Sequence, residues 1–267
     1  MDLARLVERG EAEANRDLFR AAPSGLAEAL GLEAFSIGDG LALIAREIDD
    51  AQFNRVFGLG VDAPIRPEHL DQVVRSFRPL GHSKARLQLA PAAERRLGVA
   101  EALAARGIAR APGGWTKRAR STADPLAAST DLAIVEAEHA PGAFGETACA
   151  GFGVPGFIAP WFEALVGRPN WRTFLAMDGD QPVGTAALYL AEDCGWLGIA
   201  AVLPQARGRG GQGALMRRRI EDARAAGKAW AVTETGAPLP GETPGPSYRN
   251  MERYGFAEVH LRANYVI

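Results

Sequence analysis

Cysteine and histidine are scarce in this sequence, and their scarcity excludes two common ways of stabilising a chain. The two cysteines, Cys149 and Cys194, and the four histidines lie far apart, without the spacing of a zinc site or of a disulfide framework. We therefore expect no metal, and we expect thiols that stay reduced in a cytoplasmic protein.

Long apolar runs are also missing. No run approaches the ~20 residues that cross a bilayer, and the first residues lack the basic start and apolar core of a signal peptide. We expect neither export nor a membrane partner.

Neither sign of charge is in excess. The chain has 30 Lys and Arg against 32 Asp and Glu, a formal net charge of −2, whereas a general nucleic-acid binder needs a basic surplus. Nucleic acid is therefore not an expected partner. With 47% hydrophobic and only 7% aromatic residues over 267 positions, the composition is that of a globular chain long enough for two domains.

Glycine is abundant in one segment, residues 202–213, between an apolar strand and a basic helix. Glycines let a backbone approach a ligand closely, and the first amides of a helix have no partner within the helix. The helix dipole also favours an anion at that end. The segment therefore predicts a loop that binds a pyrophosphate.

Two known phosphate loops fit this segment poorly. Ala214 stands where a Walker A loop has its lysine. The glycines at 208, 210 and 213 do spell the dinucleotide pattern G-x-G-x-x-G, with Glu234 about twenty residues further on. However, four residues separate them from the strand, and only residues 235–267 remain for the further βα units that such a fold needs. A nicotinamide-dependent oxidoreductase stays as an alternative.

A third loop fits better. The pattern Val202-x-Pro204-x-x-Arg207-Gly-x-Gly before a helix resembles the acyl-CoA loop of the GNAT superfamily of N-acyltransferases. One departure is Gln212, which stands where the family has a small residue, and we expect Gly211 and Gly213 to relieve the crowding. The resemblance implies acetyl-CoA as cosubstrate, held by Ala200, Ala201, Val202, Arg207, Gly208, Arg209, Gly210, Gly211, Gln212 and Gly213. Asn250 and Ser247, on the last predicted helix, are further candidates for cofactor contact, or else they cap or solvate that helix.

The order of predicted elements over residues 131–267 also resembles that family. Residues 171–177 and 182–190 flank a turn, and residues 195–203 form the strand before the loop. The helix after the loop has a small and apolar face, with arginines 217, 218, 219 and 224 on a solvated face. A strand at 229–233 follows, then a helix from Pro246 to Gly255. The expected fold is α/β, a mixed and largely antiparallel GNAT-type sheet flanked by helices.

The first half repeats part of this order. Helices are predicted at 2–22 and 92–106, and strands at 40–48 and 85–90. A strand, a helix and a glycine before an apolar residue recur in both halves, which indicates a degenerate GNAT-like half without an anion loop; an unrelated α/β cap is the alternative. The predicted domains are residues 1–120 and 131–267, joined by a linker at 121–130.

Transfer of an acyl group to an amine needs a neutral amine and a proton for the departing thiolate. The resemblance places a tyrosine near the thioester at position 251, where this chain has Met251. Glu234, at the end of a strand, is our candidate base, or else a salt-bridge partner. Tyr248, one turn before Met251, is the candidate acid, or else packs.

The predicted function is N-acetylation of a primary amine on a small molecule or peptide, with acetyl-CoA as donor. A CoA-binding sensor or scaffold without catalysis is the alternative that Met251 leaves open. Three aromatic residues in or next to the loop-rich stretch 142–170 either line an acceptor pocket or belong to the core. They are Trp161, Phe162 and Trp171.

Overall fold

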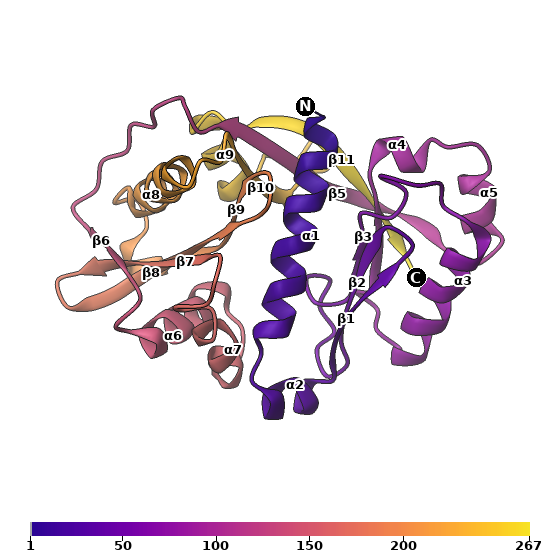
Figure 1. The fold of residues 1–267 in the computed structure, drawn as a ribbon, viewed down its shortest axis with the longest axis horizontal. Helices are drawn as coiled ribbons and strands as arrows, with labels where there is room; N and C mark the ends of the chain where they lie inside the picture. Colours follow the sequence, from indigo (N-terminus) through magenta and orange to yellow (C-terminus); the bar gives the residue numbers. More distant parts are fainter. Residues whose placement is uncertain (1) are drawn as a thin grey trace. The chain divides into compact units, whose positions relative to one another are not determined.

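The computed structural model describes residues 2–267, which pack into two compact units (Figure 1). Unit 1 holds the residues up to Arg20, Ala27–Arg118 and Glu234–Ile267, and unit 2 holds Ala21–Leu26 and Ala119–Thr233. The unit boundaries fall within two strands, β5 (Ala109–Ser121) and β10 (Trp230–Gly236). The packing units therefore differ from a sequential division, because the last residues of the chain pack with N-terminal elements. The predicted domains at residues 1–120 and 131–267, with a linker at 121–130, stay a prediction.

Unit 2 contains the strand order β10-β9-β8-β7-β6. Neighbouring strands are antiparallel, except that β9 and β10 are parallel. The predicted hairpin is confirmed, with Asp178 paired to Gln181 around a left-handed glycine at 179. The bounds of the four strands other than β10 are β6 (Ala133–Glu136), β7 (Trp171–Asp178), β8 (Gln181–Leu190) and β9 (Gly195–Val202).

Helices cover both faces of this part of the sheet (Figure 1). Helix α8 (Gly211–Ala225) makes the crossover that parallel β9 and β10 require. The other face carries α6 (Pro141–Phe152) and α7 (Ala159–Glu163), with η2 (Gly156–Ile158) between them.

The expectation that Arg219 lies on the solvated face of α8 is wrong. Arg219 is 1% exposed, because it follows Leu215 and precedes Ala223 by four residues each and so shares their buried stripe. The buried apolar residues of α8 are otherwise as predicted, and they include Ala214, Leu215, Ile220 and Ala223.

Unit 1 contains the strand order β1-β2-β3-β4-β11-β5. The face of this sheet that α3 covers is apolar, and the core there includes Ile44, Val56, Leu70 and Phe77. Strands β3 and β4 are parallel and are connected through α3. The bounds are β1 (Leu32–Ile37), β2 (Gly40–Ala45), β3 (Arg55–Phe57), β4 (Arg86–Leu89), β11 (Ala257–Val266), α1 (Leu3–Ala21), α2 (Ser24–Leu30), α3 (Pro67–Phe77), η1 (Arg78–Leu80), α4 (Pro91–Glu94), α5 (Val99–Ala104) and α9 (Pro246–Arg253).

The predicted helix over 92–106 is two helices, α4 and α5. Gly98 separates them in a left-handed conformation with φ of 81°, which an α-helix cannot include. Helices α1 and α9 and strands β2 and β4 match their predictions with bounds that differ by a few residues, whereas β1 and the long β5 were not predicted. None of the helices in residues 2–267 is long and apolar enough to cross a membrane.

Candidate functional site

The glycine-rich loop joins β9 to α8 through a short turn, η3 (Pro204–Ala206). Gly208 and Gly210 have φ of 81° and 82°, a left-handed conformation that favours glycine. Gly210 is the N-cap of α8 and has no side chain to offer the helix amides. The sequence of this segment therefore makes a sharp turn and leaves the start of the helix uncapped.

The amides at this turn are unpaired. The first helical hydrogen bond of α8 runs from Ala214 N to Gly210 O, at 3.1 Å. In the described chain, residues 2–267, the amides of 208–213 donate no hydrogen bond. Because these N–H groups lie at the positive end of a 15-residue helix, they form a site for an anion.

Strand β9 is bulged just before the loop. Thr185 pairs with Ala201 and Ala187 pairs with Gly198, so Ile199 and Ala200 together oppose one residue of β8. On its other edge, β9 pairs with β10 only at Gly195 and Trp196. The backbone of Ala200, Ala201 and Val202 therefore runs toward the loop with no strand partner on the β10 side, within the residues described.

The two arginines of the loop differ in their partners. Arg207 is exposed, and its Nε donates to Val202 O at 3.1 Å. Arg209 binds two carboxylates, Asp131 at 2.6 Å from Nη2 and Asp178 at 2.5 Å from Nη1. These hydrogen bonds lower the pKa of both aspartates. Sequence reasoning missed both partners, since they lie far from the loop along the chain.

The glycines of the loop are not equivalent. A Cβ atom on Gly210 would lie 2.0 Å from Ser129 O, and one on Gly211 would lie 2.8 Å from Leu132 Cδ1. A Cβ atom on Gly208 would meet nothing within 4 Å. Gly210 is therefore required by the backbone of the preceding linker, whereas the contact at Gly211 is with the end of a leucine side chain outside that linker. Further along, Gln212 is half-buried and Gly213 is buried.

Glu234 belongs to a buried charge network in unit 1. Lys117 Nζ donates to Glu234 and, at 2.6 Å, to Glu11. The guanidinium of Arg55 lies 3.7 Å from the other oxygen of Glu234. Burial, and next the charge of Glu11, raise the pKa of Glu234. Arg262 completes the network through Glu8 at 2.6 Å and Glu11 at 2.5 Å.

Sequence reasoning missed this network, because its members come from separate elements of unit 1. Glu8 and Glu11 lie on α1, Arg55 on β3, Lys117 on β5 and Arg262 on β11. The segments around these residues gave no signal that the charges would be buried together.

Tyr248 lies on α9, with its ring 4.0 Å from the guanidinium carbon of Arg118. Its hydroxyl makes no hydrogen bond within residues 2–267. Lys117, the partner of Glu234, and Arg118, the partner of Tyr248, are consecutive in β5, so their side chains leave the strand on opposite faces. The structure therefore does not bring Glu234 and Tyr248 together.

The remaining residues of α9 are placed as follows. Asn250 is half-buried and Ser247 is exposed. Met251, at the position where a tyrosine was expected, is 6% exposed and packs in the interior.

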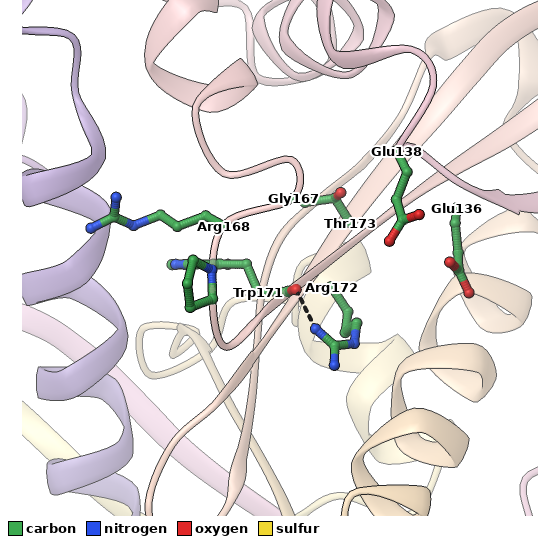
Figure 2. Close-up of a pocket in the computed structure, with 8 residues that line it drawn as sticks. Glu136, Glu138, Gly167, Arg168, Trp171, Arg172 and Thr173 are labelled. Atoms are coloured by element: carbon green, nitrogen blue, oxygen red, sulfur yellow. Dashed lines mark hydrogen bonds between the residues drawn. The ribbon is translucent and has the colours of Figure 1, made fainter.

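Unit 2 also has a pocket of 140 Å³ beside the start of β7 (Figure 2). Figure 2 shows Glu136 and Glu138 on one side of it and Arg172 across from them. Glu136 is paired with Arg218, and Arg172 donates to Trp171 O at 2.9 Å. The other lining residues are Gly167, Arg168, Pro169, Trp171 and Thr173. The pocket adjoins the end of β7 opposite to Asp178, and is thus distinct from the loop.

The aromatic candidates for an acceptor pocket are mostly core. Trp161 and Phe162 are buried at 0% and 5% exposure. Trp171 is buried as well, edge-to-face with Tyr189 at 5.0 Å, although one side of it lines the pocket of Figure 2.

A family comparison matches a segment of the chain that contains the loop. Residues 145–238 match the model of the acetyltransferase (GNAT) family. No curated protein matches the sequence. A GCN5-related N-acetyltransferase from Kribbella flavida has a similar structure, with a TM-score of 0.59 and 17% identity over 98% of this chain and 94% of that one.

Two further structures are similar over a smaller part. A GCN5-related N-acetyltransferase from Sphaerobacter thermophilus has a TM-score of 0.56 and 16% identity, covering 79% of this chain and 70% of that chain. A tandem GNAT protein from the clavulanic acid biosynthesis pathway has a TM-score of 0.54 and 15% identity, covering 79% and 73%. The chain thus shares its fold with GNAT N-acetyltransferases of known structure, and its residues 145–238 match the model of the GNAT acetyltransferase family.

Proposed function

We propose that the chain is an N-acyltransferase that moves an acetyl group from acetyl-CoA to a primary amine. The observation that supports this function most is the row of unpaired amides over residues 208–213, at the start of α8 and directly after a bulged strand. Such amides stabilise a pyrophosphate without needing a metal or a lysine.

Each part of the site takes a different part of the cosubstrate in this proposal. The amides of Gly208, Gly210 and their neighbours hold the pyrophosphate, with Arg207 adding a charge-assisted hydrogen bond. The backbone of Ala200–Val202 pairs with the amide groups of the pantetheine arm, and Asn250 is a further contact. Arg209 orders the loop through Asp131 and Asp178, because its charge is already neutralised by them.

The proposed acyl transfer needs few side chains. The amine nitrogen attacks the thioester carbon, the carbon–sulfur bond breaks, and the thiolate takes a proton while the amine loses one to water. We propose Tyr248 as the proton donor, since its hydroxyl makes no hydrogen bond within residues 2–267. Glu234 fits the structural alternative better, because Lys117 and Arg55 contact its two oxygens.

The test is calorimetric titration of the protein with acetyl-CoA and, separately, with NAD. Saturable binding of acetyl-CoA alone is expected, and saturable binding of NAD without binding of acetyl-CoA would overturn the proposal. Release of free CoA is then measured with a panel of small and peptide amines. Tyr248→Phe, run in the same assay, is expected to lower kcat by about 10²- to 10⁴-fold with little change in acetyl-CoA affinity.

A CoA sensor is the second candidate function, because a buried Met251 occupies the position of the expected tyrosine. Binding of acetyl-CoA with no release of CoA for any amine of the panel would favour the sensor over the enzyme.

A further inference from the structure

Arg219 is a buried cation without a carboxylate partner. It is 1% exposed, and it forms no ion pair with any residue of the described chain. Burial lowers the pKa of its guanidinium to about 9. Burying a charge without a counter-ion is costly, so the contacts that Arg219 makes in return indicate what the residue contributes.

Within the described chain, the hydrogen bonds of Arg219 all go to backbone carbonyls of unit 2. Its Nε donates to Leu215 O on α8 at 3.1 Å. Its Nη1 lies 3.3 Å from Ala187 O on β8 and 3.3 Å from Gly198 O on β9. Ala187 and Gly198 face each other as the register pair that adjoins the bulge. Arg219 therefore connects α8 to both strands at the point where their pairing is interrupted.

The bulge is a strained segment that needs such support. Ile199 has φ of 49°, a left-handed conformation that is unfavourable for a β-branched residue. The hydroxyl of Thr185 reaches Ile199 O only at 3.5 Å, which is a weak contact. A Cβ atom on Gly198 would lie 1.9 Å from the ring of Trp196, so no side chain fits at position 198 beside the bulge.

We propose that Arg219 is a positioning residue, which holds the bulge of β9 so that the backbone of Ala200–Val202 faces the pantetheine arm of the acyl-CoA. This inference rests on the proposed function. Arg219 makes no hydrogen bond to the amides of residues 208–213 within the described chain, so we expect its loss to affect the phosphate site less than the bulge.

The test separates the arm of the cosubstrate from its nucleotide. Dissociation constants for acetyl-CoA and for adenosine 3′-phosphate 5′-diphosphate, which keeps the pyrophosphate but lacks the arm, are measured by calorimetry for the wild type, Arg219→Lys and Arg219→Met. Both variants are expected to bind acetyl-CoA about tenfold to hundredfold more weakly, because a small displacement of a positioning group has large effects. Binding of the nucleotide without the arm is expected to change by less than about twofold.

Two further variants are measured in the same way, one as a control and one to relieve the strain at the bulge. Arg224→Met removes an exposed arginine from the same helix and should leave both constants unchanged. Ile199→Gly removes the strain at the bulge, since glycine adopts positive φ freely, and should restore part of the acetyl-CoA affinity to Arg219→Lys. Arg219→Lys also keeps the buried charge, so it remains informative if Arg219→Met does not fold.

Equal weakening of both ligands would overturn the inference and would give Arg219 a general role in the fold. Unchanged acetyl-CoA binding in the two Arg219 variants would overturn it as well. Failure of the wild type to bind acetyl-CoA at all would instead contradict the proposed function.

Discussion

At the scale of single residues, two glycines with the same backbone conformation have different reasons to be glycine. Gly208 and Gly210 both have φ near 80°, at 81° and 82°. Only Gly210 is in contact with the linker, where Ser129 O would be 2.0 Å from an added Cβ atom. An added Cβ atom on Gly208 would meet nothing within 4 Å, so we expect a side chain there to extend toward the region that the loop amides face.

Gly208→Val is therefore the informative change at this loop. The side chain is expected to occupy the phosphate position and to abolish acetyl-CoA binding, at a cost in stability of about 1–2 kcal/mol for the left-handed backbone. Calorimetry and thermal unfolding measure the two effects. Gly210→Val, which the sequence alone suggests as an equivalent, should instead disturb the packing of the loop itself. Binding by Gly208→Val within a few-fold of the wild type would show that the loop does not hold the phosphates.

At the scale of elements, unit 1 contains a second connection of the same kind as β9-loop-α8. Strands β3 and β4 are parallel, and α3 connects them after a turn with left-handed glycines at 58 and 60. The amides of this turn are already engaged by the carboxylate of Asp39, from the turn between β1 and β2. Gly60 N, Asp62 N and Ala63 N donate to it at 2.8, 2.6 and 3.1 Å.

Because Asp39 occupies the anion position of this second turn, the chain should bind one acetyl-CoA. A calorimetric stoichiometry of one per chain is expected. Asp39→Ala should lower the free energy of unfolding by about 1–3 kcal/mol, since three amides lose their acceptor, and should leave the acetyl-CoA affinity unchanged. Asp180→Ala, at the exposed turn between β7 and β8, is the matched control and should change neither. A stoichiometry of two would contradict the assignment.

At the scale of the whole chain, the charge network of unit 1 joins residues from both ends of the sequence. Glu8 comes from the first helix and Arg262 from the last strand, and they are connected by hydrogen bonds of 2.9 and 2.6 Å. His260 also contacts Glu8, at 2.8 Å. The network lies on the α1 face of the sheet, opposite to the apolar α3 face, so ion pairs contribute to the contact between α1 and the strands beside the buried apolar residues of α1.

The network predicts a loss of stability in acid. The pKa of Glu8 is lowered from 4.5 to about 2 by Arg262 and His260, which outweigh the opposing effect of burial, and the pKa of Glu11 is lowered too. A depressed carboxyl pKa stabilises the fold above the unfolded value and loses that contribution as the pH falls, here between about 4.5 and 2. The raised pKa of Glu234 acts with the opposite sign and offsets part of it.

Denaturant unfolding between pH 7 and pH 2 measures this dependence. The contribution of Glu8 is about 3 kcal/mol at neutral pH by linkage. Glu8→Gln should therefore lower the stability at pH 7 and flatten the decline below pH 4.5. Parallel pH profiles for Glu8→Gln and the wild type would exclude Glu8 as a source of the acid sensitivity.

The sequence predicted what depends on neighbours along the chain. The hairpin of β7 and β8 follows from alternating strands around Asp178 and a glycine, and the loop and α8 follow from glycines placed before a helical pattern. The break between α4 and α5 at residues 95–98 was missed, because a single glycine within a helical pattern is often tolerated and does not by itself end a helix.

The amino-acid sequence by itself determined the β7–β8 hairpin, the glycine-rich turn before α8 and the family resemblance of that segment, because turn and helix conformations depend on local residues. The tertiary structure alone decided which charges are buried and what they contact. Arg219 faces inward against the bulge, Arg209 is paired with Asp131 and Asp178, and Glu234 is held by Lys117. The physical reason is that a charge is stabilised by partners close in space, and these partners lie on other elements that only folding brings within reach.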